Sequence, residues 1–311
     1  MEFSENEIIG NKKSLNWYNL LEKVRNQNKL GGESQWIFRA LDKWRGNNIP
    51  IMSSFDDAWE RPSAGTSHSK KDRGLYESWM LLDFKREANN YLTHLPKPED
   101  SLEWLALARH YEMPSRLVDF TYSFYVAAYL ALSTRGRRFN EKQKKEDEDG
   151  CILAINLTWM KEQVEHKLKN TWCQKYDICF KQASFHNTEL FRKFAFKYTE
   201  DYVVPVNPLR RNPRLAKQQG LFLCPGNIKE DFDKNLRKTL EGEENVKRLI
   251  RLRTNLRSEA MRDLSKMNVS LATLYPDLSG WAKSRRDLVH EDIRDDRFRI
   301  VLKNALKNPY I

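Results

Sequence analysis

The sequence predicts an α+β fold, in which small mixed or antiparallel sheets are flanked by helices within a single compact domain. Short apolar segments rich in aromatic and β-branched residues, such as QWIFRAL (35–41) and CILAINL (151–157), alternate irregularly with longer segments of helical periodicity. This order does not follow a regular β-α-β pattern. There is also no internal repeat and no linker long enough to force two domains. We therefore expect a helical extension over residues 1–29, one domain over 30–287 and a tail over 288–311.

The first third of the chain gives clear helix and strand signals. Residues 12–28 have helical periodicity, and residues 35–41 read as a strand with Arg39 near its carboxyl end. Residues 42–67 contain several Pro, Ser and Gly without a clear period, which predicts a long mobile loop or lid. A long helix is expected over residues 71–92.

The central stretch contains the strongest pattern. Apolar residues three and four apart predict a helix over residues 104–111, which Pro114 ends because proline lacks an N–H and disfavours helix before it. Residues 124–132 are apolar on all sides and predict a buried helix, which Thr121 or Ser123 can cap. Two core helices would hold the polar turn between them rigidly.

The remaining elements are assigned from the same signals. Residues 135–150 are a charge-dense loop, residues 170–200 are ambiguous, and residues 207–219 are basic and rich in turn residues. Strands are expected at 151–157, 202–206, 221–224 and 246–252, and helices at 158–167, 228–240, 254–266 and in a last segment reaching about residue 287.

Composition limits the class of protein and its partners. The 54 basic and 43 acidic residues give a net charge of +11, which makes an anionic partner such as a nucleotide or nucleic acid plausible, beside the alternative of a charged protein without one. The four cysteines form no C-x-x-C pair, so we expect free thiols in a reducing compartment and no metal site. No apolar run approaches the roughly 20 residues of a membrane span. We expect a cytoplasmic protein without a signal peptide.

Five polar residues of the central stretch form the first candidate site. In the structural interpretation, Arg116 pairs with Asp119 to fix the turn, and His110 caps its own helix. In the functional interpretation, Arg116 holds an anion, Asp119 orients a neighbour and His110 transfers a proton or donates a hydrogen bond, with Tyr111 and Thr121 beside them.

Other candidates come from elsewhere in the chain. Arg39 points either to solvent or into a cleft at the sheet edge. Gln218 and Gln219 precede a glycine and a strand, so their amides face either solvent or a ligand. Glu77 and Glu189 are acidic residues in apolar surroundings, and each is either a solvated helix residue or a catalyst.

These segments together resemble the FRG-domain family, named after a Phe-Arg-Gly motif. The motif stands here as Phe38-Arg39-Ala40, without its glycine. The family's second block, approximately Q-H-Y-G-hydrophobic-P-T-R-L-L-D-W-T, is matched by RHYEMPSRLVDFT over residues 109–121. A third block, R-x-x-x-Q-x-G-hydrophobic-F, is matched from Arg214 to Phe222, and a closing hydrophobic-P-D-L-x-G by residues 275–280. The resemblance covers roughly residues 30–285 and implies an FRG-type domain.

The resemblance also implies a class of function. Such domains occur in bacteria and phages, in contexts of abortive-infection defence, which implies a toxic effector directed at a phage or host macromolecule. The order of Arg39, then Thr121 with Ser123, then Gln218 or Gln219 is similar to that of ADP-ribosyltransferases. That similarity implies NAD as cofactor.

Three functions follow as hypotheses. In an ADP-ribosyltransferase-like enzyme, Arg39 and Arg116 would hold phosphate, His110 and Tyr111 would position ribose or nicotinamide, and Gln218 or Glu77 would orient the acceptor. The second hypothesis is an RNA- or DNA-directed effector, in which His110 acts as general acid or base beside Arg116. Its phosphates would be bound by the basic cluster of Arg210, Arg211, Arg214 and Lys217. The third is a non-catalytic sensor that binds a nucleotide or a phage protein.

Overall fold

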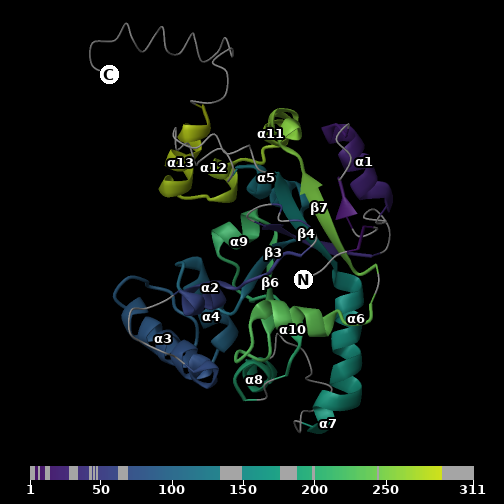
Figure 1. The fold of residues 1–311 in the computed structure, drawn as a ribbon. Coiled ribbons are helices and arrows are strands. Elements are labelled where there is room, and N and C mark those ends of the chain that lie inside the picture. Colours follow the sequence, from purple (N-terminus) through teal and green to yellow (C-terminus); the bar gives the residue numbers. More distant parts are fainter. Residues whose placement is uncertain are drawn as a thin grey trace, which may run out of the picture.

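The fold is built on one mixed sheet of seven strands in the order β1-β7-β4-β2-β3-β6-β5 (Figure 1). It is seen in a computed structural model that describes residues 4–5, 8–10, 15–27, 34–41, 44, 46, 48–61, 69–133, 149–175, 188–197, 200–243 and 245–288. All neighbouring strands are antiparallel except β1 and β7, which are parallel. The strands are β1 (Ile8–Ile9), β2 (Trp36–Leu41), β3 (Val118–Thr121), β4 (Gly150–Asn156), β5 (Val203–Val206), β6 (Gly220–Pro225) and β7 (Lys247–Leu252).

Helices connect and cover these strands. The α-helices are α1 (Trp17–Gln27), α2 (Ser54–Glu60), α3 (Arg73–Ala88), α4 (Ser101–His110), α5 (Phe124–Ser133), α6 (Leu157–Lys167), α7 (Cys173–Lys175), α8 (Thr188–Arg192), α9 (Pro213–Lys217), α10 (Phe232–Thr239), α11 (Arg257–Lys266), α12 (Leu271–Leu274) and α13 (Leu278–Leu288). Short 3-10 turns precede α3 (Lys70–Asp72) and α11 (Thr254–Leu256), and π-helical turns follow α6 (Leu168–Trp172) and α8 (Lys193–Lys197).

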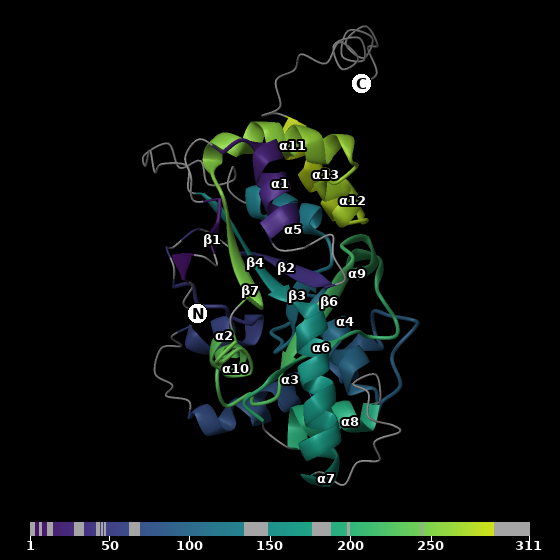
Figure 2. The same cartoon turned by 90° about the vertical axis from the view of Figure 1, so that its right-hand side faces the viewer.

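One face of the sheet is covered by α5, which lies with α1 and α11 on the same side (Figure 2). The alanines of α5 are buried because this helix is apolar on all sides and sits directly on β2 and β4. The ring of Phe124 lies 5.7 Å from Phe38 of β2 and 6.2 Å from Trp17 of α1. The N-terminal helix therefore shares the core of the sheet.

The other end of this face, over β6 and β5, is covered by α4 and α8, and α3 lies outside α4. The opposite face is covered by α10 and the start of α6. Because side chains alternate along a strand, Ile37 and Leu41 pack there with Val118 and Phe120 of β3. Asp119 and Thr121 consequently point to the α4 and α5 face.

The α+β prediction is confirmed, and most helices and strands lie where the sequence places them. Three predictions of irregular structure are wrong. Residues 118–121 are a strand, because they pair with β6 throughout and with β2 at Thr121. The expected loop at 42–67 contains α2, which starts with a Ser53–Asp56 capping box. The turn-rich segment at 207–219 contains α9, capped by Asn212 with Pro213 at its first position.

Candidate functional site

A pocket lies where α4, β3, β6 and the α9 segment meet. It encloses about 250 Å³ of space, its open mouth included. Its walls combine a few apolar side chains with guanidinium, imidazole, carboxylate and amide groups, which can hydrogen-bond a polar ligand. The lining residues are Ala106, Arg109, His110, Asp119, Asn212, Arg214, Leu215, Gln218 and Phe222.

Arg109 and Asp119 form an ion pair in the pocket wall. The Nε and Nη2 atoms of Arg109 donate to Oδ2 of Asp119 at 2.9 and 2.6 Å. From the neighbouring strand, Nη1 of Arg39 donates to the backbone carbonyl of Asp119 at 2.8 Å. Asp119 is therefore fixed at both its side chain and its backbone, and it holds the guanidinium of Arg109 in one orientation.

His110 is the last residue of α4 and supplies the imidazole of the pocket. Its Nδ1 atom is buried and has no hydrogen-bond partner among the described residues. Burial lowers the pKa of His110 below its ordinary value, the positive charge of Arg214 lowers it further, and Asp277 opposes both. The lowered pKa favours the neutral imidazole, and its Nδ1, unpartnered among the described residues, is closed to solvent.

Two pocket side chains are positioned from outside by the end of α12. The guanidinium of Arg214 lies 4.5 Å from the ring centre of Tyr275, and its Nη2 is 3.4 Å from the hydroxyl. Nε2 of Gln218 donates to the carbonyl of Leu274 at 3.3 Å. The first turn of α13 needs a glycine, because a Cβ at Gly280 would lie 2.1 Å from the carbonyl oxygen of Tyr275.

The chain leaves α4 beside the pocket through a left-handed residue. Glu112 has φ of +64°, its N–H donates to Arg109, and the N–H of Met113 donates to Ala108 at 3.0 Å. This is a Schellman ending, in which glycine is the preferred residue at the position of Glu112. The family's second block has glycine there. Glu112 replaces that glycine and still adopts the left-handed backbone conformation that glycine favours.

Arg116 and Glu77 do not line the pocket, contrary to the expectation that Arg116 holds an anion. Both side chains are buried, and Nε of Arg116 lies 2.9 and 2.8 Å from the two carboxylate oxygens of Glu77. Arg116 also donates to the carbonyl of Ala195. Burial alone would lower the pKa of Arg116, but the charge and hydrogen bonds of Glu77 outweigh burial and raise it. Arg116 therefore pairs with Glu77, and the expected partner Asp119 pairs with Arg109.

The other predicted residues fall into two groups. His110, Asp119 and Gln218 come together in the pocket. Five others do not line it. Arg39 lies on the opposite face of the sheet, and Tyr111 and Gln219 are exposed. Thr121 donates to the carbonyl of Gln218 at 2.6 Å, and Ser123 caps α5 by accepting from the N–H of Val126.

Arg109, Asn212 and Arg214 complete the pocket. The sequence placed Asn212 and Arg214 in a basic candidate segment before Gln218, with Arg214 as a phosphate contact of a nucleic-acid effector, and gave Arg109 no role. The signal for Arg214 was its place four residues before Gln218, which puts both on one side of a helical turn. The signal for Arg109 was its position directly before His110. Neither signal separates a pocket arginine from a surface arginine.

Comparison with known families adds the classification. Residues 52–148 match the model of the FRG domain. The chain carries an FRG domain. This FRG domain contributes Arg109, His110 and Asp119 to the pocket, whereas Arg214 and Gln218 follow it in sequence. No match was found among curated proteins or among solved structures.

Other site types find no support in the described part of the chain. Its His, Cys, Asp and Glu residues form no group that could hold a metal ion. None of its helices combines the length and apolar character needed to cross a membrane. Cys224 is buried beside the Glu77–Arg116 pair, and burial raises the pKa of its thiol to about 12, so it stays protonated.

Proposed function

We propose that this FRG-domain protein is an effector of anti-phage, abortive-infection defence that binds NAD in the pocket and carries out ADP-ribosyltransferase-like chemistry. The observation that carries the proposal is the arrangement of Arg109 and Arg214 around His110, whose Nδ1 has no partner among the described residues. Two fixed guanidinium groups bind phosphate oxygens strongly, and a neutral imidazole can accept a proton beside them.

The size of the pocket limits how NAD would bind. Sites that bury a drug-sized ligand enclose roughly 300–1,000 Å³. The volume of about 250 Å³ in this pocket includes solvent at its open mouth, so the enclosed part is much smaller. It therefore takes one part of the dinucleotide, with the pyrophosphate between Arg109 and Arg214 and the remainder across the open mouth.

The chemistry assigns roles to the residues of this pocket. The bond between ribose C1′ and nicotinamide breaks, nicotinamide leaves with the bonding electrons, and positive charge develops on the ribose. The carboxylate of Asp119 stabilises that charge, and the amide of Gln218 orients the acceptor. The acceptor forms the new bond to C1′ and loses a proton, which His110 accepts.

Release of nicotinamide from NAD by the purified protein, with and without cell lysate as a source of acceptors, tests this proposal. We expect His110→Ala and Arg214→Ala to abolish release and toxicity in cells. Arg211→Ala is the matched control, because Arg211 is exposed and does not line the pocket. If the wild-type protein releases no nicotinamide under any of these conditions and NAD does not raise its melting temperature, the proposal is wrong.

A second candidate function is action on RNA or DNA. It is favoured by three exposed basic residues beside the pocket: Arg210 and Arg211, which precede α9, and Lys217 at its end. In that case RNA or DNA is cleaved in cells expressing the wild-type protein, and His110→Ala prevents cleavage. Stabilisation by NAD without turnover in either assay would instead favour the nucleotide sensor.

A further inference from the structure

Helix α3 buries two charged side chains beside Leu81 and Ala88 and exposes three large apolar ones. Arg73 and Glu77, one turn apart, are buried. Leu75, Trp79 and Leu82 lie on the other side and are 71%, 61% and 48% exposed. A surface helix normally shows the reverse arrangement, and a contiguous exposed apolar stripe marks an interaction site.

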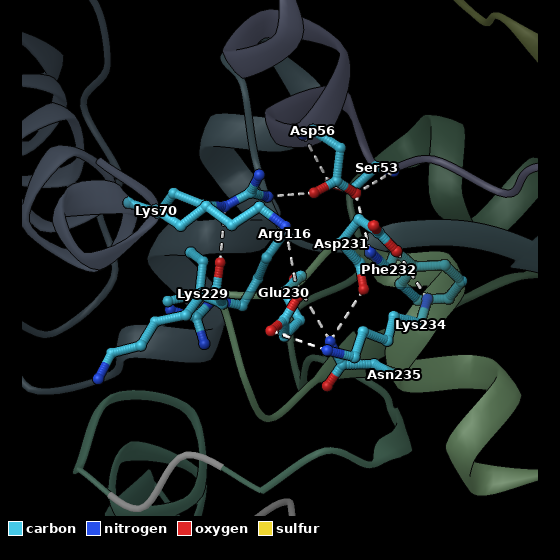
Figure 3. Close-up of polar contacts among 12 residues, drawn as sticks. Ser53, Asp56, Lys70, Arg116, Lys229, Glu230, Asp231, Phe232, Lys234 and Asn235 are labelled. Carbon is cyan, nitrogen blue, oxygen red and sulfur yellow. Dashed lines mark hydrogen bonds and ion pairs between the residues drawn. The ribbon is translucent and has the colours of Figure 1, made fainter. Parts of the chain in front are cut away.

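The buried side of α3 is firmly attached to the rest of the domain. Arg73 forms a buried ion pair with Asp56 and donates to the carbonyl of Ile228 at 2.7 Å. Asp56 also accepts from Ser53 and from the backbone N–H of Phe232 (Figure 3). Helix α3 is therefore firmly held, and it lies at the edge of the molecule (Figure 1).

The sequence of the stripe indicates its partner. Asp72, Leu75, Trp79, Leu82 and Arg86 follow one another at intervals of three and four residues, which is the spacing of a helix that packs along another helix. Asp72 and Arg86 lie seven residues before and after Trp79. When two such helices cross antiparallel at Trp79, the acidic end of each meets the basic end of the other. Neither Asp72 nor Arg86 forms an ion pair with a described residue of its own chain.

We infer that two copies of the chain associate through an antiparallel pair of α3 helices, with Trp79 at the twofold axis. The stripe is complementary to itself in charge, as an isologous interface requires. Each copy hides Leu75, Trp79 and Leu82 from water, while Asp72 and Arg86 form an ion pair at both ends. This association depends on α3 alone and is independent of the proposed chemistry in the pocket.

Sedimentation velocity over a wide range of protein concentration tests the inference. We expect a concentration-dependent dimer that Trp79→Asp converts to a monomer. Because Trp79 is exposed, the variant should melt at the temperature of the wild-type protein at concentrations where the wild type is monomeric. Met267→Asp is the matched control, because Met267 is also a large apolar residue, is 49% exposed and lies at the end of α11, away from α3. This variant should leave the dimer intact.

The charge pairs give an independent test. Asp72→Arg or Arg86→Asp alone should weaken association by roughly tenfold, since two exposed pairs are lost at once. The double variant Asp72→Arg/Arg86→Asp should restore it, because the exchanged charges again face each other. A monomer at every concentration, a dimer unaffected by Trp79→Asp, or a double variant weaker than both single variants would overturn the inference.

Discussion

Glu77 and Arg116 form an ion pair closed to solvent, with side-chain exposures of 0% and 2%. They lie 39 residues apart and join α3 to the segment that leads into β3. Arg116 also donates to Ala195, so a single guanidinium links three segments of the chain. Such pairs are costly to break because the remaining charge has no water to replace its partner.

Glu77→Leu should therefore lower the free energy of unfolding by about 3–5 kcal/mol. Glu77→Leu combined with Arg116→Met should lose less, because no charge is then buried without a partner. Urea unfolding of the four proteins in this double-mutant cycle measures both effects. Two single-variant losses that simply add in the double variant would contradict the assignment of a coupled pair.

Glu112→Gly should stabilise the protein by about 1 kcal/mol, because a residue with a Cβ is strained in the left-handed conformation at φ of +64°. Glu162→Gly is the matched control, since Glu162 is exposed inside α6, where glycine costs about 1 kcal/mol. Thermal melting should show shifts of opposite sign. A loss of stability at Glu112→Gly would mean that its side chain contributes more than the backbone strain costs.

The fold class and most elements could be predicted because hydrophobic periodicity is a local property. The continuous apolar run of α5 and the β-prone run of β2 are each visible within ten residues. β3 was missed because it has four residues and two of them, Asp119 and Thr121, are polar. Its conformation depends on pairing with β6, about a hundred residues later.

The candidate site was predicted only in part, since sequence shows which residues are polar but not which partners they choose. His110 and Asp119 were singled out as part of a polar cluster, and Gln218 by its place before a glycine and a strand; all three line the pocket. The partners of Arg116 and Asp119 were misassigned, because both possible arginines lie within ten residues of Asp119. Only the three-dimensional structure shows that Glu77 takes one of them.

The protonation of His110 should respond to its two charged neighbours in opposite directions. Arg214→Met removes a positive charge and should raise the pKa of His110, whereas Asp277→Asn removes a negative charge and should lower it further. NMR titration of the His110 ring protons measures both. Unchanged values in both variants would place these charges too far away to act.

The lowered pKa of His110 also sets the sign of a stability effect. At a pH between the lowered pKa of folded His110 and its ordinary pKa in the unfolded chain, the unfolded chain binds more protons than the folded one. The contribution of His110 to the free energy of unfolding is therefore fully present above the ordinary pKa. It is lost as the pH falls from the ordinary pKa through the lowered one. His110→Gln should remove this part of the pH dependence in chemical unfolding experiments. The same dependence in the variant would assign it to other groups.

Gly280→Ala should destabilise the protein by about 1–3 kcal/mol, because the added Cβ would overlap the backbone of Tyr275. Gly74→Ala is the matched control. A Cβ there would make only an ordinary 3.4 Å contact with Ile228, and alanine favours the helix by up to about 1 kcal/mol. Thermal melting compares the two. Equal tolerance of both substitutions would show that the first turn of α13 adjusts without strain.

Tyr275 should act as a positioning residue for Arg214, because its ring lies against the guanidinium while the residue itself does not line the pocket. Tyr275→Phe keeps the ring and loses only a long hydrogen bond, so it should bind inorganic pyrophosphate almost as the wild type does. Tyr275→Leu loses the cation–π contact and should weaken binding by roughly three- to thirtyfold. Isothermal titration calorimetry measures both dissociation constants.

The matched control for this comparison is Trp281→Leu, which removes a similar contact between Trp281 and Arg285 on α13, outside the residues that line the pocket. It should leave pyrophosphate binding unchanged. Equal weakening by Tyr275→Phe and Tyr275→Leu would assign the effect to the hydroxyl and not to the ring. Equal weakening by Trp281→Leu would mean that loss of any cation–π contact near the C-terminal helices loosens the pocket, and Tyr275 would then have no specific role in orienting Arg214.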